Sequence, residues 1–142
     1  MKPYKKQIVV AILATFGSIS SINAQHAHDA KMDDFTTKQI QSDVSKQLVP
    51  NRVALRVKGL ICESCGLGIR RKLVREKTVN TKADNKGINM DIKRMLLYID
   101  LKEGVEPDFS RYIKAVKAAG YEPVRTYQKV GKSLQVGEVK QG

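Results

Sequence analysis

The sequence contains few of the residues that most enzymes use for acid–base or nucleophilic chemistry. Its 142 residues include two histidines, two cysteines and no tryptophan. Both histidines, His26 and His28, lie in a polar stretch near the amino end, which excludes imidazole catalysis within the folded part of the chain. There is no Ser/His/Asp set, no glycine-rich phosphate-binding loop and no paired catalytic carboxylate. We therefore expect a protein that is not an enzyme.

Long hydrophobic runs are also scarce. The apolar run at residues 8–16 is far shorter than the roughly 20 residues of a transmembrane helix. Three lysines precede it, and small residues follow it up to Ala24. This pattern predicts a secretory signal peptide at residues 1–24, cleaved before Gln25. The mature protein is then expected to be periplasmic or secreted, without a transmembrane anchor.

Acidic residues are outnumbered, with 14 aspartates and glutamates against 26 lysines and arginines. The predicted signal carries three basic residues and no acidic one, so the mature net charge is +9. An exported chain meets lipid headgroups, cell-wall polymers and acidic proteins, and we predict no nucleic-acid partner. Because the basic residues are scattered, they indicate solubility and loose electrostatic steering. Arg70, Arg71 and Lys72 either guide an acidic partner or form a solvated helix face.

The composition divides the chain into one domain with two tails. Residues 25–51 form a polar leader that we expect to be mostly disordered, with one weak amphipathic helix at most. Residues 129–142 contain glycines and scattered apolar residues, which predicts a flexible C-terminal tail. The folded domain is expected at residues 52–128.

Within that domain, hydrophobic periodicity predicts six elements. Alternation from Val53 to Val57 predicts a strand with Ala54 on its polar face, and helical spacing predicts a helix at about 64–76. A β-hairpin over 88–101, a helix from Pro107 to Gly120 and a last strand at 121–127 follow. The order β-α-β-β-α-β predicts a ferredoxin-like α+β sandwich, with two helices on one face of a four-stranded antiparallel sheet. Its expected core comprises one face of the hairpin together with Val53, Leu55, Val57, Ile69, Leu73, Phe109, Ile113 and Val116.

Both cysteines lie in the segment GLICESC, at Cys62 and Cys65, where the first strand gives way to the first helix. The positive end of a helix favours thiolate over thiol, and thiolates are soft ligands that suit copper(I) and related ions. A structural zinc site usually needs four protein ligands, which this chain does not offer near the pair. The pattern thus favours an exposed two-sulfur site from which an ion can be passed on.

The segment GLICESC, the following Ile69 and Leu73, and the segment AAGY ending at Tyr121 together resemble the heavy-metal-associated domain family over about residues 53–127. That family includes copper chaperones, modules of copper-transporting ATPases and the periplasmic mercury-binding protein. The resemblance implies that Cys62 and Cys65 are metal ligands and that Tyr121 shields the metal. Leu60 stands where the family usually has methionine, and it can pack beneath the loop.

The resemblance further implies a metallochaperone that binds copper(I), with mercury(II), zinc or another soft metal as alternatives. Its expected partners are a metal-transporting membrane protein or an acidic protein. Ile61 replaces the family's usual threonine and changes the environment of the first ligand.

Two other interpretations of the cysteine pair stay open. An exported pair normally oxidises, but so short a loop would add little stability as a structural disulfide. A Cys-x-x-Cys at a helix start is also typical of thiol–disulfide redox proteins, which makes a periplasmic redox protein the alternative function. Separately, His26 and His28 are either polar filler or a weaker copper(II) site.

Overall fold

The computed structural model describes residues 37–140, apart from the side chain of Cys65. The predicted signal peptide and the histidines of the leader lie outside the described residues. Within the described part of the chain, no helix is both long enough and apolar enough to cross a membrane.

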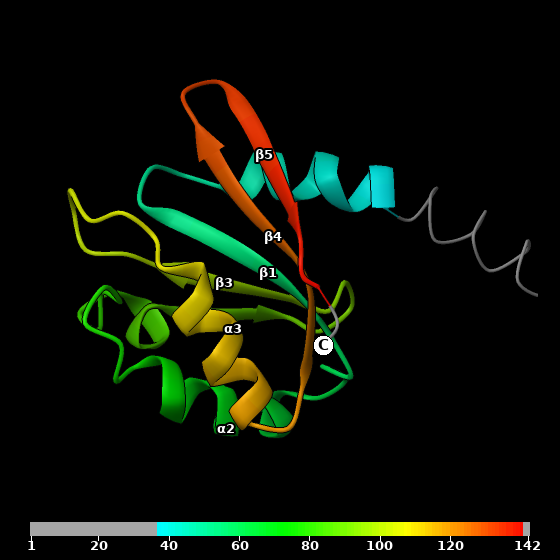
Figure 1. Ribbon diagram of the computed structural model, residues 1–142, viewed down its shortest axis with the longest axis vertical. Helices are drawn as coiled ribbons and strands as arrows, with labels where there is room; N and C mark the ends of the chain where they lie inside the picture. The colour runs from blue at the N-terminus through cyan, green and yellow to red at the C-terminus, as the bar shows by residue number, and fades with distance from the viewer. Residues whose placement is uncertain (1–36, 141–142) are drawn as a thin grey trace, which may run out of the picture.

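The protein is α+β and is built on one five-stranded antiparallel sheet (Figure 1). The strands lie in the order β2-β3-β1-β4-β5. Their bounds are β1 Arg52–Lys58, β2 Ile88–Asp91, β3 Leu96–Asp100, β4 Glu122–Val130 and β5 Ser133–Glu138. The helices are α2 Glu63–Leu73, α3 Phe109–Ala118, the 3-10 helix η1 Asp84–Gly87 and a helical segment at 37–47.

The predicted α+β class is confirmed, whereas the predicted count of four strands is wrong. The fifth strand, β5, comes from the segment that we expected to be a flexible tail. It pairs with β4 from Val130 opposite Ser133 to Arg125 opposite Glu138. Gly131 has a φ of 60° in the two-residue turn, and a positive φ is readily adopted by glycine in tight hairpins. The hairpin therefore depends on turn geometry and pairing, because most of β5 remains exposed.

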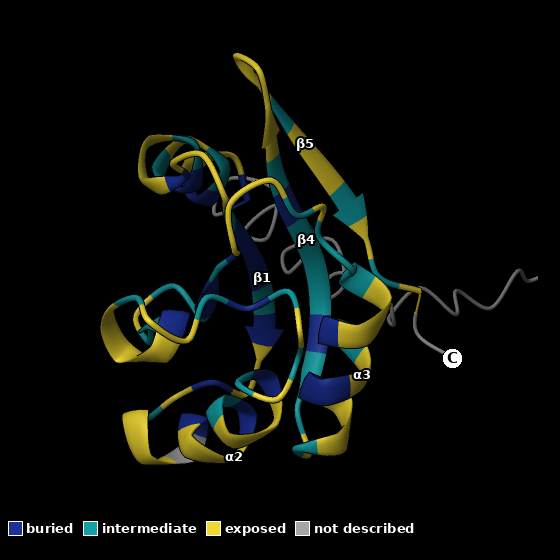
Figure 2. Cartoon of the chain, turned by 90° about the vertical axis from the view of Figure 1, so that its left-hand side faces the viewer, coloured by how far each residue is buried: buried dark blue, intermediate teal, exposed yellow. Residues whose placement is uncertain are grey.

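Helices α2 and α3 cover one face of the sheet and enclose the main hydrophobic core (Figure 2). Of the eight expected core residues, six are buried and two, Phe109 and Ile113, are only partly buried. Phe109 instead packs edge-on against the fully buried ring of Tyr112, with 6.1 Å between ring centroids. This core fixes both helices above the sheet.

A second core lies on the opposite face of the sheet, where we expected a polar surface and a mostly disordered leader. The helical segment 37–47 buries Ile40 and Val44 there, and Leu48 follows directly after it. These side chains pack with Ala54 of β1 and with buried residues of β3 and β4. The prediction of a mostly disordered leader is therefore corrected from residue 37 onward. A helix that buries its apolar stripe is stabilised by tertiary packing, which the sequence pattern alone does not show.

Candidate metal and redox site

The loop between β1 and α2 is fixed by one buried side chain and exposes its neighbour. Gly59 turns the chain after β1 with a φ of 84°, a conformation that favours glycine. Leu60 is fully buried, in agreement with a packing role beneath the loop, whereas Ile61 is 74% exposed. Leu60 therefore anchors the loop to the core, and the chain from Ile61 onward faces solvent.

Cys62 lies directly before α2, which begins at Glu63. Its carbonyl oxygen accepts a hydrogen bond from the Gly66 N–H at 3.4 Å, and its Sγ lies 3.4 Å from the Ser64 Oγ. The residue is partly exposed. The unpaired N–H groups and the positive dipole end of α2 thus lie where a Cys62 thiolate would form after reduction.

Cys62 is disulfide-bonded in this structure. No free cysteine occurs in the described part of the chain. The sequence offers Cys62 one possible partner within the chain, Cys65. The oxidised pair has no thiolate to donate, so metal binding at this loop requires its prior reduction by two electrons and two protons.

Tyr121 lies beside the cysteine loop. Its ring atom Cδ1 is 3.8 Å from the position that a Cβ on Gly59 would occupy, and its N–H donates to the Val116 carbonyl at 3.2 Å. The ring is partly buried against the main core. The structure therefore brings Tyr121 next to the base of the loop, and its role as a metal shield stays a prediction.

Met90 of β2 is a neighbour of the site that the sequence analysis missed. Its thioether occupies the space that a side chain at Gly66 would fill, and Leu60 lies on the same glycine. Gly66 faces the sheet one helical turn after Cys62, so a larger residue there would push Met90 aside. The signal for this contact in the sequence was a glycine inside the predicted helix.

The three basic residues that we grouped on one helix face separate in the structure. Arg70 turns inward, is partly buried and donates from Nη2 to the Ile88 carbonyl at 3.3 Å. Arg71 and Lys72 are exposed. Of these three residues, Arg71 and Lys72 are therefore placed to meet a partner in solution, and Arg70 is not.

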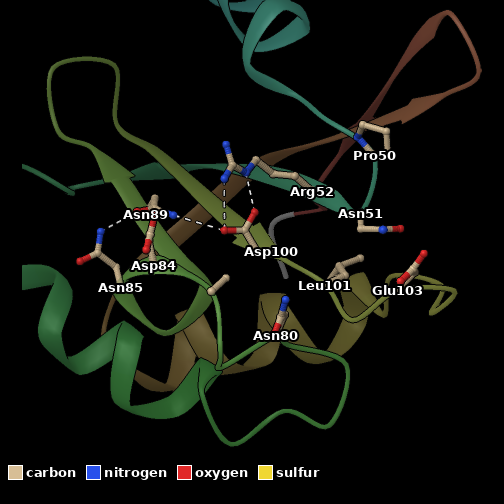
Figure 3. Close-up of a pocket in the computed structure, with 11 residues that line it drawn as sticks. Pro50, Asn51, Arg52, Asn80, Asp84, Asn85, Asn89, Asp100, Leu101 and Glu103 are labelled. Carbon is tan, nitrogen blue, oxygen red and sulfur yellow. Dashed lines mark hydrogen bonds and ion pairs between the residues drawn. The ribbon is translucent and has the colours of Figure 1, made fainter.

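A polar pocket lies at the opposite end of β1 from the cysteines (Figure 3). Arg52 donates to both carboxylate oxygens of Asp100, at 2.5 and 3.2 Å, and this hydrogen bonding raises the pKa of Arg52. Asn89 also donates to Asp100, and Asn85 donates to Asn89 at 2.7 Å. Because these side chains already hydrogen-bond to one another, we interpret the pocket as a polar lining that closes this end of the sheet.

Among residues 37–140, no three His, Cys, Asp or Glu side chains gather as a metal-binding group. Fold and site together define an α+β protein with a Cys-x-x-Cys pair at the junction of β1 and α2. No protein-family model, curated protein or solved structure matches this chain.

Proposed function

We propose that this protein is an exported carrier that captures copper(I), or a related soft ion, through Cys62 and Cys65. It then passes the ion on by ligand exchange or sequesters it. Mercury(II) and zinc are the alternative cargoes, and the proposed recipient is a metal-transporting membrane protein or an acidic protein. The protein acts by binding and not by catalysis.

The proposal includes a specific fold, the ferredoxin-like sandwich. Without the edge strand β5, the strand order is β2-β3-β1-β4, with α2 and α3 as the two helical connections on one face. That is the plan of the split βαβ sandwich. We regard β5 and the helical segment 37–47 as additions to a ferredoxin-like domain of the heavy-metal-associated kind.

The observation that carries the proposal is the position of Cys62 at the accessible start of α2, on a loop held by buried Leu60. A rigid base keeps two sulfur ligands in place, and an accessible rim lets an incoming thiolate reach a bound ion. Soft copper(I) accepts sulfur ligands, whereas structural zinc sites are usually closed by four protein ligands. A two-cysteine loop therefore suits copper(I) better than zinc.

The second candidate, a thiol–disulfide redox protein, is favoured by the disulfide at Cys62. Such a protein would exchange its disulfide with a substrate dithiol, which would lose two electrons and two protons to the pair. The sheet argues against a thioredoxin-like relative. All its strand pairings are antiparallel, and β3 separates β1 from β2, whereas a thioredoxin-like Cys-x-x-Cys lies in a βαβ unit whose parallel strands pair directly. We therefore rank redox exchange second.

The test is a copper(I) titration against a competing chelator, under reducing and anaerobic conditions. The chain from Gln25 onward contains every described element and is the protein to use. We expect one-to-one binding that is lost in the Cys62→Ser, Cys65→Ser double variant and kept in Glu63→Gln, which changes the same loop without touching a sulfur. Equal, weak binding by all three proteins would refute the carrier proposal, and the reduction potential of the pair would then test the second candidate.

A further inference from the structure

The layer formed by α2 and α3 carries a clear excess of positive charge. Residues 63–77 and 108–119, which contain α2 and α3, carry eight basic and three acidic residues. The helical segment 37–47 on the opposite face carries two basic residues and one acidic residue. The two covering layers thus differ strongly in charge.

Two of the three acidic residues on the α2 and α3 layer are already paired with one cation. Arg111 lies 3.5 Å from the Glu76 carboxylate and 3.2 Å from that of Asp108. Six exposed basic residues remain, and within the described chain none of their side chains makes an ion pair. One of them, Lys77, lies farthest past the end of α2, and we call the other five the positive helical face: Arg71, Lys72, Arg75, Lys114 and Lys117.

The positive helical face extends across two neighbouring helices. The Glu76–Arg111 pair joins the end of α2 to the start of α3, and Gly68 faces Ala119 at the other end. The helices are therefore antiparallel and lie side by side, with their exposed sides directed away from the sheet (Figure 2). The five cations form one broad surface of long, unrestrained side chains.

Exposed aliphatic side chains accompany this charge at the cysteine end. Leu67 precedes Arg71 by one helical turn and is 45% exposed, and Ile61 is 74% exposed. Basic residues together with exposed aliphatic residues bind anionic lipid surfaces, because the charges attract headgroups and the apolar groups enter the headgroup boundary. Unpaired lysines and arginines without fixed geometry suit a diffuse layer of headgroups better than a protein surface with matched ion pairs.

We propose that the positive helical face docks on an anionic phospholipid membrane, with Leu67 and Ile61 entering the headgroup region. The surface would hold the protein at the membrane with both helices against the headgroups. This inference does not depend on the proposed function, since the five basic residues lie outside the segment from Cys62 to Cys65.

The test is co-sedimentation of the chain from Gln25 onward with vesicles of equal parts phosphatidylglycerol and phosphatidylcholine, or of phosphatidylcholine alone. One variant, Lys72→Gln, Lys114→Gln, Lys117→Gln, removes three charges from the positive helical face. The matched control, Lys46→Gln, Lys129→Gln, Lys132→Gln, removes three exposed charges elsewhere. Each charge at an anionic surface changes partitioning about fivefold, so the face variant should bind about a hundredfold more weakly.

We expect binding to phosphatidylglycerol vesicles only, weakened by salt, lost in the face variant and largely kept in the control. The cysteine double variant should bind like the unaltered chain, which separates this test from that of the metal site. If the two charge variants lose vesicle binding equally, binding depends on net charge alone and the proposal is overturned. Binding to polyglutamate through the same face, without binding to vesicles, would overturn it in favour of an acidic protein partner.

Discussion

Single glycines illustrate how local conformation decides what a residue does in this fold. Gly68 lies in α2, is exposed, and a Cβ there would lie 3.9 Å from the Ala119 Cβ, an ordinary contact. Gly87 has a φ of 77°, and a Cβ there would lie 2.5 Å from the backbone oxygen of Asn80. The same substitution must therefore have opposite effects at the two positions.

We predict that Gly68→Ala raises the free energy of unfolding by about 1 kcal/mol, because alanine is the better helix former. Gly87→Ala should lower it by about 1–3 kcal/mol, because the backbone conformation and the Asn80 carbonyl both oppose a side chain. Urea denaturation of both variants measures the two effects. A loss of stability in Gly68→Ala would contradict the antiparallel arrangement of α2 and α3 at this point.

Tyr98 of β3 is buried in the second core, and its hydroxyl has no hydrogen-bond partner in the described chain. Burial raises the pKa of Tyr98 to about 12, from 10.0 in the unfolded chain. The unfolded state loses this proton first, so Tyr98 destabilises the fold as the pH rises above 10.0 towards about 12.

We predict that Tyr98→Phe is about 1 kcal/mol more stable than the unaltered chain at neutral pH, because it removes an unsatisfied buried hydroxyl. The advantage should grow in alkaline solution. Chemical denaturation from about pH 8 to about pH 11 measures it, over the range in which an ordinary tyrosine begins to ionise. An advantage that stays constant over this range would contradict the raised pKa.

At the scale of elements, α3 begins with a side-chain cap. Asp108 accepts a hydrogen bond from the Ser110 hydroxyl at 2.6 Å and from the Arg111 N–H at 3.2 Å. The Ser110 hydrogen bond, followed by that of the Arg111 backbone, lowers the pKa of Asp108 below 3.8. A lowered carboxyl pKa stabilises the fold above the unfolded value, and this stabilisation is lost as the pH falls through the folded value.

We predict that Asp108→Asn, which keeps a capping side chain, is less stable than the unaltered chain at neutral pH. The difference should vanish only once the pH falls below the lowered pKa of folded Asp108, because both proteins then carry a neutral cap. Thermal unfolding at several pH values measures this, with Asp108→Ala as the control that loses the cap at every pH. A difference that persists in acid would mean that charge contributes nothing to this cap.

The cysteine loop also belongs to the scale of elements. Its chemistry depends on the junction of a strand with a helix, because the turn after β1 buries Leu60 and α2 supplies the positive helix start. Neither element alone would place Cys62 in partial exposure above a fixed base.

At the scale of the whole molecule, the sheet is enclosed on both faces, and the segment 37–48 supplies the second enclosure. Leu48 is 2% exposed in that core, whereas the adjacent Gln47 is exposed. We predict that Leu48→Ala lowers the free energy of unfolding by about 2–4 kcal/mol, as large-to-small core substitutions do. Gln47→Ala is the matched control and should change it by less than about 0.5 kcal/mol. Equal, small effects in urea denaturation would show that the segment does not stabilise the sheet.

The sequence by itself determined the elements whose apolar residues recur with a clear period. Alternation identified β1, a helical stripe ending at Gly120 identified α3, and the position of the cysteines between strand and helix followed from the same patterns. These signals are local, because each strand or helix must direct its own apolar residues to one side.

Only the tertiary structure decided what covers the second face of the sheet, how many strands the sheet has and where the basic residues gather. Ile40, Val44 and Leu48 are too few to form a stable helix alone, and they become a core only against Ala54, Tyr98 and Tyr127. Strand β5 forms because β4 offers an edge to pair with, and the positive helical face exists because two helices distant in sequence lie side by side. Long-range packing sets each of these features, and a one-dimensional pattern does not encode it.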